Sequence, residues 1–363
     1  MEIPGYKGNL RWLPSRTVFL TRHGSHAYGL ATPASDLDIK GVAVPPAEYY
    51  LGFTQRFEQA ECADPDTVIF ELRKFMQLAA DCNPSVVEIL FTHPDDHLGV
   101  TPVGERLLAA RELFLSKKAK HTFSGYAMAQ LRRLETHHRW VSAPPAAPPR
   151  REDFGLRSLT DEEQSRLASV HAEIDKLVKQ WELDLSALPR DAQDDLRERI
   201  TAAISERVAA DSPSWRAAAR TLGLDDDLTA RIAREREFRA RLREWEQFAT
   251  WQKSRNPRRA ELEARFGYDT KFGAHVVRLL RMCREILTDG AVNVRRPDRD
   301  ELLAIRGGAW PFEKLRAWAV DEDAAMEALM KSSKLPHAPD RKALDALCVS
   351  LVEESLRGAP PRS

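Results

Sequence analysis

Three short apolar runs near the N-terminus predict buried strands. They lie at 17–20, 37–44 and 67–70, and Pro45 and Pro46 end the second run. Each run has the length of a strand and is followed by turn-forming or polar residues. The pattern therefore predicts a small sheet in the first hundred residues.

Helical spacing takes over after the third run. Helices are predicted at 72–82, 86–91 and 103–115, with Asn83-Pro84 ending the first. The first of these helices has one apolar face, made of Leu72, Phe75, Met76 and Ala79. Strands followed by helices predict an α/β layer, which we assign to residues 1–116.

The remainder of the chain reads as largely helical. Residues 117–142 form a predicted helical connection, and a proline-rich linker starts the segment 143–265, which is charged and has helical period. Residues 266–363 are again helical in pattern. The whole predicts an α+β fold in which a small mixed sheet is followed by a largely helical C-terminal part.

Composition adds limits to this picture. Lys plus Arg and Asp plus Glu are 55 each, so the formal net charge is zero and any nucleic-acid surface must be a local patch. The four cysteines are far apart, which favours reduced thiols over a disulfide framework or a zinc site. No run of about 18 apolar residues occurs, so we expect a cytoplasmic protein without a membrane partner.

A Gly-Ser turn follows the first predicted strand. Gly24 lets the backbone approach a phosphate closely, and the Ser25 hydroxyl with neighbouring N–H groups can donate to phosphate oxygens. Such turns are common, so the pair alone is a weak sign of phosphate binding.

Two aspartates mark the start of the second predicted strand. Asp36 and Asp38 are two residues apart and therefore point to the same face of a strand. Adjacent carboxylates repel each other unless a cation lies between them, and hard oxygen ligands suit Mg²⁺. The alternative interpretation is a polar turn in which Asp36 only caps the strand.

A third carboxylate is expected on a neighbouring strand. Asp66 opens the third predicted strand and Glu71 closes it. Five residues separate them, so they face opposite sides of a regular strand and only one can join the aspartate pair.

The segment 24–38 resembles the nucleotidyltransferases of the DNA polymerase β superfamily, and more narrowly the branch associated with bacterial RNA-repair systems. The narrower resemblance continues through the blocks at 66–75, 83–91 and 123–131, and through Gly267-Tyr268-Asp269-Thr270-Lys271 with His275 and Arg278. The segment from about 143 to 265 is unmatched.

This resemblance implies roles for individual residues. Gly24 and Ser25 would contact the triphosphate of an NTP such as ATP. Asp36, Asp38 and Asp66 would be the catalytic carboxylates and would hold two Mg²⁺ ions, or Mn²⁺ in their place. Glu71 would then be a helix-start residue.

Lys271, His275 and Arg278 are a second candidate site. Their spacing of i, i+4 and i+7 puts them on one helix face, where they can meet a triphosphate or an RNA backbone. A solvated basic face is the plain alternative. With the resemblance, we expect these three residues to contribute to nucleotide binding.

The sequence therefore predicts a metal-dependent nucleotidyltransferase that moves a nucleotide from an NTP to an acceptor hydroxyl, with an RNA end as the favoured acceptor. Two other functions stay open: adenylylation of a small molecule or a protein side chain, and a non-catalytic module that binds NTP or RNA. Retention of the Asp36–Asp38 pair argues against the non-catalytic module.

Overall fold

The computed structural model describes residues 1–33, 35–157 and 226–358. Two compact units are present: a larger one made of Met1–Glu135 and Arg265–Ser363, and a smaller one of Thr136–Ala264. The larger unit thus contains both the predicted core of 1–116 and the predicted C-terminal part of 266–363.

The larger unit is built on a five-stranded sheet in the order β3-β4-β2-β1-β5. Strand β2 pairs in parallel with β4 and antiparallel with β1, so the sheet is mixed. The strands are β1 (Thr17–His23), β2 (Asp38–Ala43), β3 (Gln59–Ala63), β4 (Asp66–Glu71) and β5 (His97–Val100).

Side chains alternate between the two faces of the sheet along each strand, so each face contributes to a different hydrophobic core. Phe19 and Val42 lie in a core with helices packed on one face, whereas Leu20 and Ile39 lie in a second core with the N-terminal segment. The covering helices are α4 (Leu72–Ala80), α5 (Pro84–Leu90), α6 (Pro102–Ala109) and α16 (Arg341–Arg357). The short helix α1 (Leu13–Arg16) precedes β1, while α2 (Gly24–Ala27) lies between β1 and β2 and α3 (Glu48–Leu51) lies between β2 and β3.

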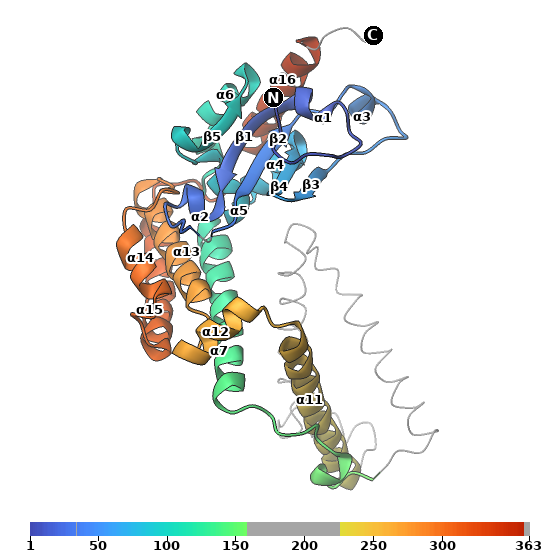
Figure 1. Cartoon of the computed structure of the whole chain (residues 1–363), viewed down its shortest axis with the longest axis vertical. Coiled ribbons are helices and arrows are strands. Elements are labelled where there is room, and N and C mark those ends of the chain that lie inside the picture. Colours follow the sequence, from blue (N-terminus) through green and yellow to red (C-terminus); the bar gives the residue numbers. More distant parts are fainter. Residues whose placement is uncertain (34, 158–225, 359–363) are drawn as a thin grey trace. The chain divides into compact units, whose positions relative to one another are not determined.

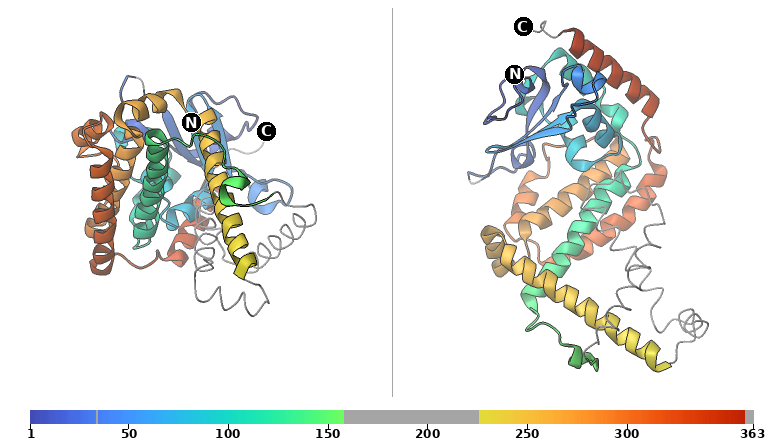
Figure 2. Two further views of the ribbon diagram at one scale, coloured as in Figure 1. Left: turned by 90° about the horizontal axis from the view of Figure 1, so that it is seen from below. Right: turned by 90° about the vertical axis from the view of Figure 1, so that its right-hand side faces the viewer.

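A helical layer follows the sheet. Its members are α13 (Thr270–Asp289), α14 (Arg299–Arg306), α15 (Phe312–Ser332) and the first part of α7 (Gly125–Ser142), which a π-helical turn at Lys120–Ser124 precedes. Helices α13 and α15 pack side by side (Figures 1 and 2). The last helix, α16, returns to the sheet and packs on α4 and α6. The predicted α+β class, a mixed sheet followed by a helical part, is confirmed.

Individual elements agree with the sequence pattern to differing degrees. The apolar face of α4 is buried as predicted. Strands β3 and β5 were not predicted, because β3 is a polar edge strand and β5 has only four residues, so neither carries an apolar run.

The smaller unit is helical where it is described. It contains η4 (Arg151–Phe154), α11 (Asp226–Ser254) and most of α12 (Pro257–Phe266), while the predicted helical pattern at 158–225 lies outside the described residues. Trp140 is 5% exposed and its ring lies 5.4 Å from that of Trp251, so it belongs to the core of this unit. Among the described residues, no helix combines the length and the apolar character that crossing a membrane requires.

Candidate functional site

Three neighbouring strands of the sheet carry polar residues in one row. His23 on β1 is the register partner of Asp38 on β2, and Asp38 is the register partner of Asp66 on β4. Register partners on adjacent strands point to the same face of the sheet. The side chains of Asp38 and Asp66 are therefore neighbours at one end of the sheet, as predicted for the acids of the site.

The charged groups around Asp38 shift its pKa in opposite directions. Partial burial raises the pKa of Asp38, and the nearby carboxylates of Asp66 and Asp36 raise it further, while Lys40 and Lys271 act in the opposite direction. The ammonium of Lys40 lies 3.9 Å from the carboxylate of Asp66. The site thus combines three carboxylates with two lysines, and two of the carboxylates are in register.

The Gly24 turn is packed directly against Asp38. Gly24 has φ of +61°, and a Cβ added there would lie 1.9 Å from Oδ2 of Asp38. Only glycine fits this close approach and this left-handed conformation. Ser25 follows in α2, whose start is not capped by any side chain of the described residues. The turn and the acids consequently form one site.

The two candidates for the third carboxylate have different surroundings. Asp66 is the register partner of Asp38, and its side chain is 60% exposed. Glu71 lies at the other end of β4, beside Ala43, where it is buried and caps α4 by accepting from the backbone N–H of Lys74. The predicted helix-start position of Glu71 is confirmed, and Asp66 is the acid brought next to Asp38.

The predicted basic face of α13 is divided by burial. Asp269 caps this helix by accepting from the backbone N–H groups of Lys271 and Phe272. Lys271 is exposed at the start of the helix and near enough to Asp38 to lower its pKa. Burial and Arg278 hold the pKa of His275 at about 3, so this imidazole is neutral.

Arg278 requires a correction. It is 2% exposed, and its Nη1 donates to Oε1 of Glu88 at 2.7 Å. A guanidinium that is buried and already paired is not available to a phosphate. The predicted direct contact between Arg278 and the nucleotide is therefore wrong, because Glu88, which is 190 residues away in the sequence, lies against this guanidinium in the core.

The acids fit a divalent cation by their chemistry. Their donors are carboxylate oxygens, which Mg²⁺ prefers, and the mutual repulsion that raises the pKa of Asp38 would be relieved by a cation. Within the described residues, however, no three Asp, Glu, His or Cys side chains are gathered closely enough to hold an ion together. Asp38 and Asp66 are the pair to which a metal role can be assigned first.

Two residues near the site were missed in the sequence. Lys40 is two residues after Asp38, so the alternation of a strand could have placed it on the same face. Glu88 is a carboxylate within the apolar run Val86-Val87-Glu88-Ile89-Leu90, and a buried charge of this kind requires a partner. The pattern could therefore have indicated a partner for Glu88 but not its identity.

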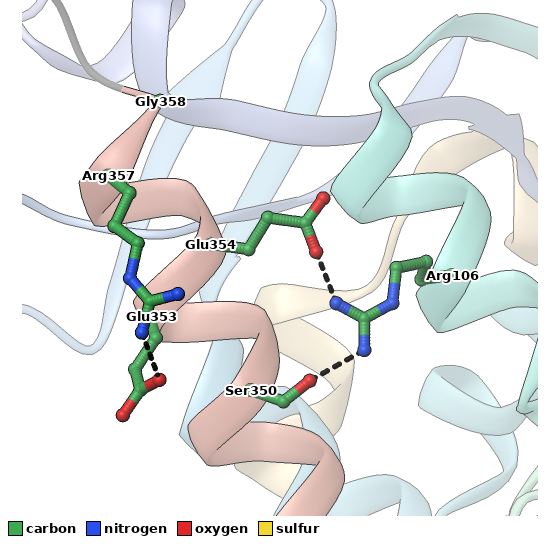
Figure 3. A pocket seen from close by; sticks show the side chains of 6 residues that line it. All are labelled: Arg106, Ser350, Glu353, Glu354, Arg357 and Gly358. Carbon is green, nitrogen blue, oxygen red and sulfur yellow. Dashed lines mark hydrogen bonds and ion pairs between the residues drawn. The ribbon is translucent and has the colours of Figure 1, made fainter.

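A separate pocket lies between α6 and α16, lined by Arg106, Ser350, Glu353, Glu354, Arg357 and Gly358 (Figure 3). Arg106 donates to Glu354 and to Ser350, and Arg357 pairs with Glu353. Helix α6 packs at the start of β1, the opposite end of that strand from His23. The charges of this pocket are satisfied among themselves and it lies away from the acids.

Comparison with known proteins agrees with the geometry of the acids and the turn. Residues 10–146 match the RNA repair pathway DNA polymerase beta family. The resemblance predicted from the motifs is thereby confirmed over the segment that contains Gly24, Ser25 and the three aspartates; Lys271 lies beyond it.

The chain is also similar to an uncharacterized 38.9 kDa protein of Enterobacteria phage T4. The two are 34% identical over 90 residues, which is 22% of this chain and 27% of the phage protein. The chain thus matches about a quarter of the length of that relative. No solved structure matches.

Proposed function

We propose that this protein is a metal-dependent nucleotidyltransferase that transfers a nucleotide from an NTP to a hydroxyl at an RNA end. One observation carries the proposal: Asp38 and Asp66 are in register on adjacent strands, and Asp38 lies against the Gly24 turn. Acids that bind cations and a turn that can bind phosphate are thus neighbours. The match to a DNA polymerase beta family supports the same reaction class.

Different residues would act on the triphosphate of the NTP and on the acceptor hydroxyl. Asp38 and Asp66, with Asp36, would hold Mg²⁺, which when bound neutralises triphosphate charge and lowers the pKa of an attacking hydroxyl. Ser25 and the backbone of the turn would donate hydrogen bonds to the phosphates, and Lys271 would add a positive charge. Asp66 is exposed and can take the proton of an acceptor hydroxyl.

RNA is the acceptor that the family description supports, since it names an RNA repair pathway. The test offers each of the four NTPs, labelled at the α-phosphate, with Mg²⁺ and an RNA oligonucleotide. The RNA is supplied with a free 3′ hydroxyl or with a 3′ end blocked by a dideoxynucleotide. We expect label to enter the RNA, and Asp38→Asn to abolish the incorporation.

Other outcomes distinguish the remaining functions. If label entered the protein or a small molecule instead, the proposed acceptor would be wrong, but the protein would still be a nucleotidyltransferase. Binding of NTP without transfer to any acceptor in a cell extract would contradict the proposed enzyme and favour a binding module.

A further inference from the structure

A buried ion pair joins α5 to α13 within the larger unit. Arg278 and Glu88 are separated by 190 residues in the sequence, and their side chains are 3% and 1% exposed. Burial opposes ionisation of Glu88, but Arg278 and Tyr28 together hold the pKa of this carboxyl below its ordinary value. Glu88 is therefore an anion in the core, where removal of its partner alone would be strongly destabilising.

The same carboxylate contacts residues on both sides of the Gly24–Ser25 turn. His23 directly precedes the turn, and its Nε2 lies 3.7 Å from Oε2 of Glu88. Tyr28 follows the turn, and its hydroxyl donates to the same Oε2. One oxygen of Glu88 thus contacts both flanks of the segment that approaches Asp38.

Arg278 holds the second flank in a further way. Its guanidinium carbon lies 3.7 Å from the centre of the Tyr28 ring, a stacked arrangement that favours a cation. In addition, Nη2 of Arg278 lies 3.1 Å from Nδ1 of His275, which is on the same helix. The backbone of Tyr28 is bound as well, since its carbonyl accepts from the N–H of Arg296.

A site that binds a triphosphate gains from groups held in place before the ligand arrives. We propose that Glu88 and Arg278 are positioning residues, which hold the Gly24–Ser25 turn beside Asp38 through the hydrogen bond and the stacked contact that they make with Tyr28, while Glu88 packs against His23. The inference rests on the proposed function of the turn as the phosphate-binding element. It replaces the predicted direct contact between Arg278 and the nucleotide with an indirect role.

The test uses a double variant of the full-length protein, Glu88→Leu/Arg278→Met. Both charges are removed at similar side-chain volume, so neither is left unpaired in the core. The matched control is Arg284→Met/Glu322→Gln, because this pair also anchors α13, with two hydrogen bonds to α15, and does not contact the turn. Tyr28→Phe releases one flank only and keeps the ring under Arg278.

The first measurement is hydrogen exchange of the amides of residues 24–30 in protein without nucleotide. We expect faster exchange there in the double variant, a smaller increase in Tyr28→Phe, and wild-type exchange in the control. Unchanged exchange in both Tyr28→Phe and a folded double variant would overturn the inference. Because this measurement needs no activity, it decides whether the turn is held even if the wild-type protein transfers no nucleotide and the proposed function fails.

The second measurement separates positioning from loss of folded protein. A smaller folded fraction lowers kcat and leaves KM unchanged, whereas a displaced turn raises KM for the NTP. We expect KM for the NTP to rise roughly tenfold to a hundredfold in the double variant, with KM for the RNA unchanged. A few-fold rise is expected in Tyr28→Phe. Equal KM values for the NTP in wild type and both variants would also overturn the inference.

Discussion

Asp38 and Asp66 are direct register partners on the parallel strands β2 and β4, so two carboxylates from segments 28 positions apart in the sequence face the same side of the sheet. Such a pair costs folding energy by itself. The raised pKa of Asp38, caused by burial and by Asp66, means that its ionised form is less favourable in the fold than in water.

Replacing either acid by asparagine should therefore separate activity from stability. Asp38→Asn and Asp66→Asn should each lower nucleotide transfer by several orders of magnitude, because the cation-binding charge is lost. Asp38→Asn should nevertheless melt no lower than the wild type at pH 7, since a repelled charge is removed. Calorimetry and the transfer assay measure the two effects.

Asp345→Asn, an exposed change on α16, is the control for these acids and should leave transfer unchanged. Near-normal transfer by Asp38→Asn would contradict the assignment of this acid.

Gly24→Ala tests the close approach of the turn to Asp38. The added methyl would lie 1.9 Å from the carboxylate, so the turn or the acid must move, and NTP use should fall by more than the roughly ten- to hundredfold expected for Ser25→Ala. Gly29→Ala is a matched control, because Gly29 also has positive φ, +71°, but its Cβ would meet no atom closer than 3.8 Å. Both changes carry the backbone strain, of about 1 kcal/mol, whereas only one reaches Asp38. Equal losses of activity in Gly24→Ala and Gly29→Ala would mean that strain, and not the acid, explains the effect.

Lys271→Ala tests whether the start of α13 meets the nucleotide or the RNA. Lys271 is near enough to lower the pKa of Asp38, so it lies close to the proposed nucleotide site. We therefore expect NTP affinity to fall while the dependence of RNA affinity on salt stays unchanged. An RNA contact would instead reduce the slope of log affinity against log salt by about 0.7. Filter binding over a range of salt concentrations measures both.

Lys342→Ala is the control for Lys271, since Lys342 is also exposed at the start of a helix that an aspartate caps, here Asp340. If Lys271→Ala and Lys342→Ala give the same NTP affinity and the same salt dependence of RNA affinity, Lys271 is an ordinary solvated lysine that contacts neither ligand.

Two histidines, His23 in the core and the half-buried His275, predict loss of stability in mild acid. Burial lowers the pKa of His23 to about 4 and that of His275 to about 3, from an ordinary value of 6.5. Between these values and 6.5 the unfolded chain binds a proton at each histidine that the folded protein does not, so the free energy of unfolding falls as the pH falls. Each histidine should contribute a loss of about 2 kcal/mol between pH 7 and pH 5.

Denaturant unfolding at several pH values checks this expectation. His275→Gln should flatten the dependence of stability on pH, whereas His337→Gln, at an exposed position, should not. An unaltered slope in His275→Gln would mean that this imidazole has the same pKa in the folded and the unfolded protein, which would contradict the expectation.

Local rules determined those features that depend on neighbours in the sequence. The period of two in a strand predicted Asp36 and Asp38 on one face, but β2 begins only at Asp38, so the rule applies to Asp38 and Lys40 and does not reach Asp36. The period of 3.6 in a helix identified the buried face of α4. The fold class followed from the order of these patterns, because strands preceded helices and each apolar face needed a covering layer.

The tertiary structure alone decided which distant residues meet. The strand pattern treated Asp66 and Glu71 as equivalent ends, and only the family resemblance favoured Asp66; the parallel pairing with β2 is what puts Asp66 beside Asp38. Arg278 looked like part of a basic helix face until Glu88, 190 residues away, lay against it in the core. Periodicity states which way a side chain points from its own element, whereas strand register and helix packing choose its partner. Whether a charged side chain such as that of Arg278 can bind a ligand or can only position other groups depends on the partner beside which the tertiary structure places it.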